Sequence, residues 1–404
     1  MRICDVNNFY TPVGGGVRVY HDRKLEYCRD RDIPYCLVVP SDRFERVTEG
    51  STLRLHVPSI KLGGSGYRLI VSRRAIRRVV AEFKPDIIEI GSPYVLPLIV
   101  PRAASEGGIP TVGFYHADYP DAYVRKITGW VSRRLAGPAS RVARRHVRWV
   151  YERMDAVFGA SDYVLEKLYG VGLRRLFRTP LGVDAETFRP DRRSESLRES
   201  LGASPSMKLV LFLARVSTEK GIDLLMEAYP AFRDPAGVQL VIGGHGPYEH
   251  HLKHFLETYP EVRRVAFVPE HKDVASLMAS ADVFLSMSND ETFGLAIAEA
   301  LACGTPVVAP DAGAAAELLS RSGVLEPYRA RDIESFVAHV RKALATSDRA
   351  TSDRLREYAL QYDWDVAFDR IVSFYGRIID AHRSGDPDSL IPGPPARWNV
   401  WTPE

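Results

Sequence analysis

The sequence predicts an α/β protein made of two Rossmann-like, doubly wound parallel-sheet domains. Three observations support this class. The chain has 404 residues, more than a single hydrophobic core usually organises. Short β-branched or apolar runs alternate with longer amphipathic stretches, which is typical of right-handed βαβ units. The alternation stops in a proline-containing segment and starts again at Lys208.

Ten short runs predict strands, and several are apolar on both faces, as expected where helices cover both sides of a parallel sheet. The predicted strands are Ile3–Val6, Tyr35–Val39, Ile87–Ile90, Thr111–Tyr115, Ala156–Ala160, Lys208–Leu213, Gln239–Gly243, Val265–Phe267, Val283–Met287 and Val307–Ala309. Helical patterns lie between them, including Ser72–Phe83, Gly221–Phe232, Val274–Ser280 and Leu295–Cys303.

A hinge is predicted near Pro180–Pro190, where the sequence TPLGVDAETFRP combines two prolines with a glycine. Each side of the hinge reads as a separate open α/β sheet, so we expect domains over residues 1–182 and 183–364. The stretch Trp364–His382 predicts an amphipathic helix, and the tail from Ser384 onward is rich in proline. We expect residues 365–404 to pack back on the first domain.

Composition argues against several classes of function. The 54 Lys and Arg nearly balance the 51 Asp and Glu, a net charge of +3 that does not favour a nucleic-acid partner. No N-terminal segment has the apolar core of a signal peptide, and the best apolar stretch, Ile87–Val100, is too short to span a bilayer. The four cysteines have no metal-ligand spacing and read as reduced thiols, so we expect a cytoplasmic protein.

A run of histidines raises the question of a metal. No cysteine or carboxylate pattern accompanies the run, which favours a polar helix end over a metal site. Its members are His245, His250, His251 and His254. We therefore expect no metal site and no cofactor.

The most informative segment is NDETFGLAIAEALACGTPVVAPDAGAAAELL, which follows the predicted strand Val283–Met287. A helix is expected to begin near Gly294, and the amides at its N-terminus would favour a diphosphate. Glu291 lies in the loop and Glu299 in the helix, with seven residues between them. A loop carboxylate can accept hydrogen bonds from sugar hydroxyls, and a helical one from ribose hydroxyls. If this pair is taken alone, the alternative is that both glutamates are solvated charges on the surface of the helix.

Two cations and a glycine cluster accompany the glutamates. Arg215 and Lys220 lie in the loop after strand Lys208–Leu213, where they suit a diphosphate. The next strand ends in GGHGP, whose Gly244 and Gly246 would let backbone approach a ligand closely. This cluster fails as a dinucleotide fingerprint, because a proline and a glutamate follow where a helix and a third glycine are required.

The order of these motifs carries a resemblance to a known family. A glycine-rich N-terminal loop, LGVDAETF, ARVSTEKG, GGHGP and ETFGLAIAEALACGTPVVA together resemble the retaining GT-B glycosyltransferases of family 4. The resemblance covers nearly the whole chain, and the Glu-x7-Glu segment is its most specific part. It implies two facing domains with a central cleft, the acceptor side over 1–182 and the nucleotide-sugar side over 183–364. One departure is Leu181, where the family usually has asparagine.

The resemblance also implies roles for the donor-side residues. Arg215 and Lys220 would hold the donor diphosphate, and Glu291 would contact the transferred sugar. Glu299 would bind ribose. The remaining donor-binding candidates are Gly15, Gly16, Gly244, Gly246, Thr292, Phe293, Gly294 and Leu295.

The acceptor half contributes a glycine loop and a histidine. Gly14–Gly16 suit a loop that passes close to a phosphate or sugar, with a flexible surface loop as the alternative. By the resemblance this loop crosses the cleft, with Arg18 as an added charge. His116 directly follows the fourth predicted strand at the carboxyl edge of the sheet. It would hydrogen-bond sugar or acceptor as a catalytic residue, and a satisfied polar residue is the alternative. Asp118 and Tyr119 are weaker acceptor-binding candidates.

Basic residues gather in the first domain. One stretch with Trp130 and Trp149 contains few acids, and such stretches can bind anionic membrane surfaces. Its cations are Arg125, Lys126, Arg133, Arg134, Arg141, Arg144, Arg145, Arg148 and Arg153. A second group is Arg73, Arg74, Arg77 and Arg78. The membrane interpretation makes the acceptor a lipid-linked or anionic glycan met at the inner membrane face, and a solvated helix face is the alternative.

The predicted function is a metal-independent, retaining hexosyltransferase that moves a mannose- or glucose-type sugar from a nucleoside diphosphate to a lipid-linked or saccharide acceptor. No carboxylate pair is well placed for a covalent intermediate. The route that the resemblance implies is front-face attack. A GT-B-fold epimerase or hydrolase acting without acceptor is the alternative. The intact donor-site set disfavours a non-catalytic binding module, and both glycine clusters fail the fingerprint of a nicotinamide dehydrogenase. The base of the donor nucleotide, the transferred sugar and the acceptor stay open at this point.

Overall fold

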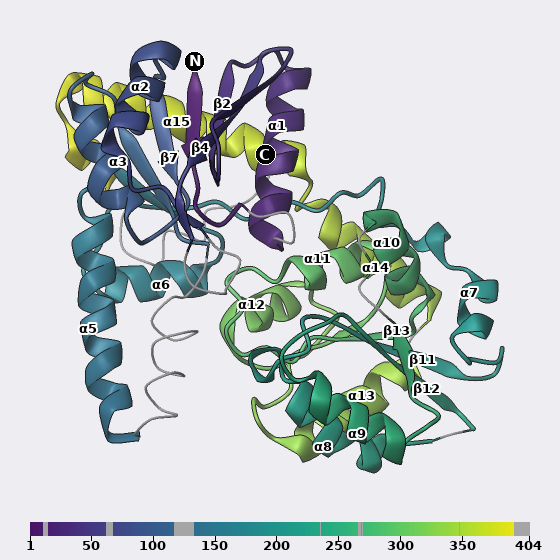
Figure 1. Cartoon of the computed structure of the whole chain (residues 1–404). Coiled ribbons are helices and arrows are strands. Elements are labelled where there is room, and N and C mark those ends of the chain that lie inside the picture. Colours follow the sequence, from purple (N-terminus) through teal and green to yellow (C-terminus); the bar gives the residue numbers. More distant parts are fainter. Residues whose placement is uncertain are drawn as a thin grey trace. The chain divides into compact units, whose positions relative to one another are not determined.

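The computed structural model describes residues 1–10, 15–61, 68–116, 133–234, 236–265, 268, 270–346 and 348–391, without the side chains of 133–140. Contacts divide the chain into two compact units, Met1–Leu181 with Asp365–Glu404, and Gly182–Trp364. Each unit is an α/β layer structure built on its own sheet (Figure 1).

The first unit contains an eight-stranded sheet in the order β10-β9-β8-β7-β1-β2-β4-β3. Its neighbouring strands are parallel except β3 and β4, which pair antiparallel at one edge. The strands are β1 (Ile3–Val6), β2 (Tyr35–Ser41), β3 (Glu45–Glu49), β4 (Thr52–Pro58), β7 (Ile87–Ile90), β8 (Thr111–Phe114), β9 (Ala156–Gly159) and β10 (Leu176–Arg178). A separate short ladder pairs β5 (Ile60–Lys61) with β6 (Arg68–Leu69).

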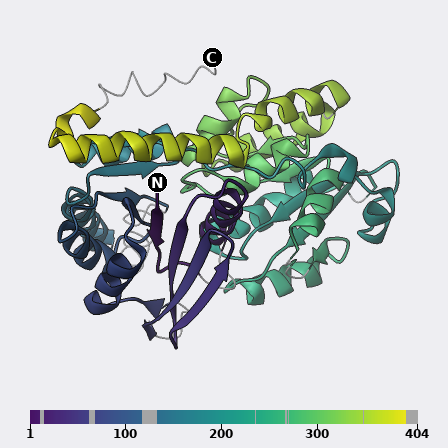
Figure 2. The same cartoon turned by 90° about the horizontal axis from the view of Figure 1, so that it is seen from above.

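Helices cover both faces of this sheet. One face packs against α2, α3, α5 and α6 through an apolar core that includes Val38, Ile90 and Val157. The opposite face packs against α1 and α15, and α15 lies along the unit as the long helix near its C-terminal end in Figure 2. The bounds are α1 (Gly16–Asp30), α2 (Arg73–Phe83), α3 (Leu96–Ser105), α5 (Arg133–Tyr151), α6 (Asp162–Gly170) and α15 (Trp364–Ser384).

A buried polar cluster lies between α1, α15 and the sheet. Lys24 Nζ is 2.7 Å from Asp5 Oδ2 and 3.3 Å from Glu89 Oε2, and all three side chains are at most 1% exposed. Lys24 also donates to the Tyr375 hydroxyl at 2.7 Å. Burial acts to raise the pKa of Asp5, but Lys24 and His21 outweigh it and lower that pKa. Burial and the nearby Asp5 raise the pKa of Glu89. The cluster fixes the C-terminal helix to the first unit.

The second unit contains a five-stranded sheet in the order β13-β12-β11-β14-β15, with every neighbouring pair parallel. The strands are β11 (Lys208–Leu213), β12 (Val238–Gly243), β13 (Arg263–Val265), β14 (Val283–Leu285) and β15 (Val307–Val308). Helices α8, α9 and α13 pack on one face and α10 and α11 on the other, with α14 packed against α11 (Figure 1). Their bounds are α8 (Ile222–Phe232), α9 (Glu249–Thr258), α10 (His271–Ser280), α11 (Leu295–Ala302), α13 (Ile333–Thr346) and α14 (Arg349–Leu360).

The predicted α/β class with two parallel sheets is confirmed, and each predicted strand corresponds to an observed one. The bounds of one strand differ. The observed β13 ends at Val265, the residue at which the predicted strand begins, and the next two residues lie outside the described ranges. The sequence prediction missed β3, β4, β5, β6 and β10. The first of these exposes most of its residues, so no apolar run marks it. None of the described helices is long and apolar enough to cross a membrane.

Candidate functional site

The strand order of the second unit creates a topological switch point between β11 and β14. From β11 the sheet extends through β12 to β13, and the chain then returns to place β14 on the other side of β11. Open α/β sheets bind ligands at such points, beyond the carboxyl ends of the strands. The loop after β11 contains Arg215 and Lys220, and the loop after β14 contains Glu291.

Lys220 and Glu291 meet at this point. Lys220 Nζ lies 2.6 Å from Glu291 Oε1, with the two side chains 31% and 20% exposed. The attraction of Glu291 raises the pKa of Lys220 above its usual value, so the amine stays charged at neutral pH. The approach depends on Gly221, which has φ +76° and whose missing Cβ would lie 2.6 Å from Met287 Cβ.

The main chain of Glu291 is held as well. The helix α12 (Gly313–Arg321) begins beside it, and the Ala314 amide donates to the Glu291 carbonyl at 2.8 Å. Gly313 has φ +62°, and a Cβ there would lie 3.0 Å from the Glu291 amide and carbonyl and from the Asn289 carbonyl. Glu291 is therefore fixed at its backbone by α12 and at its carboxylate by Lys220.

Glu299 lies in α11, whose N-terminal boundary agrees with the prediction. The helix is preceded by Gly294 with φ +89°, and Glu299 is partly buried in it. The Phe293 side chain is 3% exposed and packs edge-on against Tyr362 with ring centroids 5.6 Å apart. Phe293 thus anchors the loop through its ring, while Thr292 and Leu295 stay partly exposed beside it.

Three further donor-site candidates have contacts within the protein: Arg215, Gly244 and Gly246. Arg215 is 53% exposed and pairs with Glu219 at 2.6 Å. A Cβ on Gly244 or Gly246 would collide with the backbone carbonyls of Ala214 and Val216, respectively. Both glycines are therefore required by the close approach of two loops, and their contact with a ligand remains a prediction.

The candidates of the first unit lie at three places. Gly15 caps the N-terminus of α1, Gly16 is its first residue, and Arg18 Nε lies 3.2 Å from Asp22. His116 lies two residues beyond β8, and its ring stacks on Phe114 with centroids 4.1 Å apart. Burial, and then the nearby His21 and Lys24, lower the pKa of His116 well below its usual value, so the ring is neutral at pH 7. Gly14, Asp118 and Tyr119 lie outside the described residues.

The two predicted basic groups differ in structure. On α2, Arg73 and Arg77 both pair with Glu106, and Arg78 pairs with Glu82. On α5, the arginines from 141 to 148 are exposed. Arg125, Lys126 and Trp130 lie outside the described residues, as do the side chains of Arg133 and Arg134. Within the described ranges, no group of three or more His, Cys, Asp or Glu residues is arranged to hold a metal ion.

Comparison with known proteins decides the family. The profile described as "Glycosyl transferases group 1" matches residues 193–362, and "Glycosyltransferase Family 4" matches residues 14–187. A GDP-mannose-dependent alpha-(1-6)-phosphatidylinositol dimannoside mannosyltransferase of Mycobacterium tuberculosis (strain ATCC 25177 / H37Ra) is 31% identical over 391 residues, 96% of this chain and 99% of that protein. The chain belongs to the family 4 glycosyltransferases.

Further matches agree with this family 4 assignment. A GDP-mannose-dependent alpha-mannosyltransferase of Mycobacterium tuberculosis (strain CDC 1551 / Oshkosh) is 30% identical over 93% of this chain and 96% of its own length. The solved sucrose-phosphate synthase of Thermosynechococcus elongatus is 16% identical, with a TM-score of 0.77 over 94% of this chain and 100% of that one. At this low identity the likeness supports the fold alone. The fold of this family 4 glycosyltransferase is GT-B.

Sequence reasoning did not single out two glycines that shape the site, Gly221 and Gly313. Each has a positive φ and stands where a Cβ would crowd the loop after β14. The available signal was their position at the start of a helix, where a glycine can adopt a positive φ that other residues rarely adopt.

Proposed function

We propose that this glycosyltransferase moves a mannosyl residue from GDP-mannose to a lipid-linked acceptor with retention of anomeric configuration. The names of the two mycobacterial relatives support the choice of donor, and the first of them supports a mannosylated phosphatidylinositol as acceptor. The observation that carries the donor site is the Lys220–Glu291 ion pair at the switch point of the second sheet.

The donor would lie across the two loops that this pair joins. A lysine ammonium has three donor hydrogens, so Lys220 can hold Glu291 and still donate to a diphosphate oxygen. Arg215 and the N-terminus of α11 would add positive potential, while Glu291 would accept from sugar hydroxyls and Glu299 from ribose. The ion pair would set the carboxylate before substrate arrives, and such preorganisation is the main source of electrostatic catalysis.

The proposed reaction is front-face attack. As the bond between the sugar and the diphosphate breaks, Lys220 and Arg215 would stabilise the charge that develops on the leaving phosphate, and that phosphate would take the acceptor proton. Removing one such donor typically costs about 3 kcal/mol of barrier height. No divalent metal is assigned a role, because the cations of the protein would neutralise the diphosphate.

The proposed place of reaction is the inner membrane face. The support comes from α5, where Val142 is 70% and Trp149 41% exposed among arginines. Helices that combine apolar and cationic residues in this way bind the surface of anionic membranes.

The test is a transfer assay with the purified full chain, GDP-mannose and vesicles that contain mannosylated phosphatidylinositol. We expect an α-linked mannolipid by mass spectrometry and glycosidase digestion, formed equally well in EDTA. A β-linked product would contradict retention, and loss of activity in EDTA that Mn²⁺ restores would contradict metal independence. Donor consumption at the same rate without acceptor would favour the hydrolase or epimerase alternative.

A further inference from the structure

The loop after β1 lies at a topological switch point of the first sheet. The chain passes from β1 to β2 on one side and later places β7 on the other side of β1. Open α/β sheets bind ligands beyond the carboxyl ends of strands at such points. The loop begins at Asn7 and leads to Gly15 and Gly16, two of the predicted donor-binding residues. The contacts that hold this loop therefore bear on the reaction.

Asn7 holds the first turn of the loop. Its side chain is fully buried, and its Oδ1 atom accepts a hydrogen bond from the Phe9 amide at 2.8 Å. Because a backbone N–H can only donate, this contact fixes which atom of the side-chain amide faces the loop. The Nδ2 atom of Asn7 then faces His21 Nε2 on α1, 2.8 Å away. Asn7 thus joins the loop to the helix that follows it.

The contact with Asn7 also assigns the hydrogen-bonding roles of the His21 ring. An amide nitrogen cannot accept, so His21 Nε2 accepts and a ring proton lies on Nδ1. His21 Nδ1 is 3.3 Å from Asp5 Oδ2, and the Tyr35 hydroxyl donates to the same oxygen at 2.8 Å. Asp5, His21 and Asn7 are all fully buried and form a network that ends on the backbone of the loop.

The space for the Asn7 side chain comes from Gly91, which directly follows β7. A Cβ on Gly91 would collide with Asn7 Nδ2, so a larger residue would displace the amide. The neighbouring backbone is fixed as well. The Gly91 amide donates to the Val6 carbonyl, and the Asn7 amide donates to the Val38 carbonyl, each at 3.1 Å. Asn7 is therefore held by both neighbouring strands as well as by His21.

The next residue of α1 holds the following part of the loop. Asp22 accepts a hydrogen bond from the Tyr10 hydroxyl at 2.6 Å, and Arg18 Nε lies 3.2 Å from its other carboxylate oxygen. Two successive residues of α1, His21 and Asp22, therefore fix the segment Asn7–Tyr10 to the first turns of the helix.

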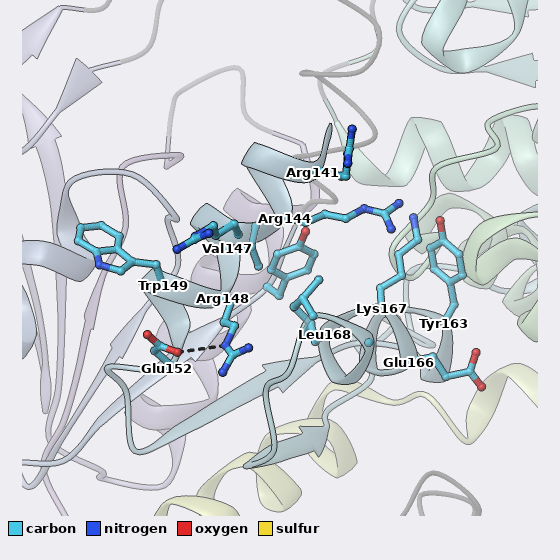
Figure 3. Close-up of a pocket in the computed structure, with 14 residues that line it drawn as sticks. Arg141, Arg144, Val147, Arg148, Trp149, Glu152, Tyr163, Glu166, Lys167 and Leu168 are labelled. Atoms are coloured by element: carbon cyan, nitrogen blue, oxygen red, sulfur yellow. Dashed lines mark hydrogen bonds and ion pairs between the residues drawn. The ribbon is translucent and has the colours of Figure 1, made fainter. Parts of the chain in front are cut away.

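The Asp5–His21–Asn7 network is separate from the cavity that Figure 3 shows. This cavity of about 1040 Å³ lies between α5 and α6, which pack on the face of the first sheet opposite to α1. Of the described residues that line the cavity, none belongs to the network. Substitutions in the network therefore leave the α5 surface unchanged, and a loss of transfer in such variants is not a loss of the proposed membrane contact.

We propose that Asn7 and His21 are positioning residues for sugar transfer, which hold the loop after β1 where Gly15 and Gly16 meet the leaving phosphate. The proposal rests on the proposed function. Neither side chain touches substrate, and each acts through the backbone of the loop. An interaction that is made as the bond breaks affects kcat more than ground-state binding. Loss of Asn7 or His21 should therefore slow transfer and leave the binding of GDP to the second unit unchanged.

Steady-state kinetics of mannosyl transfer test Asn7→Ala and His21→Phe against the wild type. We expect kcat to fall at least tenfold in each, since a displacement of about 1 Å at a site can cost a hundredfold. The Kd for GDP should stay within about twofold of the wild type, because its proposed ligands lie in the second unit. The double variant should lose no more than the worse single variant, because both residues act in one network.

A conservative variant and a matched control separate positioning from stability. His21→Gln offers an oxygen that can accept from Asn7, and its kcat should exceed that of His21→Phe. Asn8 is equally buried, but its Oδ1 accepts from the Ile70 amide at 2.9 Å. Asn8→Ala should lose stability as Asn7→Ala does and keep the kcat of the wild type. Equal kcat values in Asn7→Ala and Asn8→Ala would overturn the proposal. If Asn7→Ala does not fold, equal values in His21→Phe and His21→Gln would overturn it.

Hydrogen–deuterium exchange without substrate keeps this test separate from the proposed function. The peptide that contains Phe9 and Tyr10 should exchange at least about tenfold faster in Asn7→Ala and His21→Phe than in the wild type, because the turn loses its support. Unchanged exchange would overturn the positioning role for any substrate. Faster exchange in the variants together with no mannosyl transfer by the wild type would support the hold on the loop and count against GDP-mannose as the donor.

Discussion

Lys220 Nζ lies 2.6 Å from Glu291 Oε1 and joins the loop after β11 to the loop after β14, where the strand order of the second sheet reverses. The two residues are far apart in the sequence, and each would be an ordinary partly exposed charge without the other. Together they place a cation and a carboxylate at the edge of the sheet where α/β proteins bind nucleotides.

Lys220→Ala removes the cation and releases the Glu291 carboxylate. We expect kcat/KM for mannosyl transfer to fall about a hundredfold or more, the usual loss for one donor to a developing charge. Steady-state kinetics checks this, with the exposed Lys253→Ala on α9 as the control. A loss below threefold would show that the ion pair does not serve the reaction.

Gly313→Ala tests whether the backbone of Glu291 must be held in place. The added Cβ would lie 3.0 Å from main-chain atoms of Asn289 and Glu291, so the loop has to shift. We expect kcat to fall at least tenfold while the fold is kept, since small displacements at a site are costly. Gly323→Ala is the matched control, because that glycine has the same φ of +62° with nothing within 4 Å. Equal activities of the two variants would contradict the positioning role.

Lys24→Ala leaves two buried carboxylates, Asp5 and Glu89, without their cation. Breaking a buried ion pair in this way costs about 3–5 kcal/mol of unfolding free energy. Tyr375→Phe removes only a hydroxyl of the same cluster and should cost about 1–2 kcal/mol. Denaturant unfolding followed by a probe in the first unit checks both. A loss below 1 kcal/mol for Lys24→Ala would mean that the cluster contributes little.

The lowered pKa of His116 predicts that the stability of the folded chain depends on pH. Its pKa in the folded chain is lowered, so between that value and the usual value of about 6.5 the unfolded chain binds more protons. The free energy of unfolding should therefore fall as the pH drops below about 6.5, by up to about 1.4 kcal/mol per pH unit from this group.

The check for His116 compares unfolding of the wild type with His116→Gln between pH 5 and 7. The variant should have a shallower slope than the wild type. Identical slopes for His116→Gln and the wild type would show that folding does not lower the pKa of this ring.

The sequence predicted the parts of the fold and the site that local patterns encode. Buried parallel strands are continuous apolar runs, and Gly294, Glu291 and Glu299 lie within one strand–loop–helix unit. The antiparallel edge β3–β4 was missed because Glu45–Glu49 is mostly exposed and polar. Its register with β4 depends on pairing rather than on an apolar pattern.

Contacts between distant segments could not be predicted. Lys24 and Tyr375 are separated by 351 residues, and Lys24 on an amphipathic helix reads as a surface charge. The one local signal was a carboxylate inside an apolar strand, at Asp5 and again at Glu89, since a buried charge needs a partner.

The most direct test of the donor site is a thermal-shift measurement of the full chain with GDP, UDP, ADP and dTDP in the absence of metal. We predict that GDP raises the melting temperature most, as expected for a ligand that binds only the folded state. The shift should be lost in both Glu299→Ala and Lys220→Ala. No stabilisation by any nucleoside diphosphate, or the same shift in the two variants as in the wild type, would contradict a nucleotide site at the β11–β14 switch point.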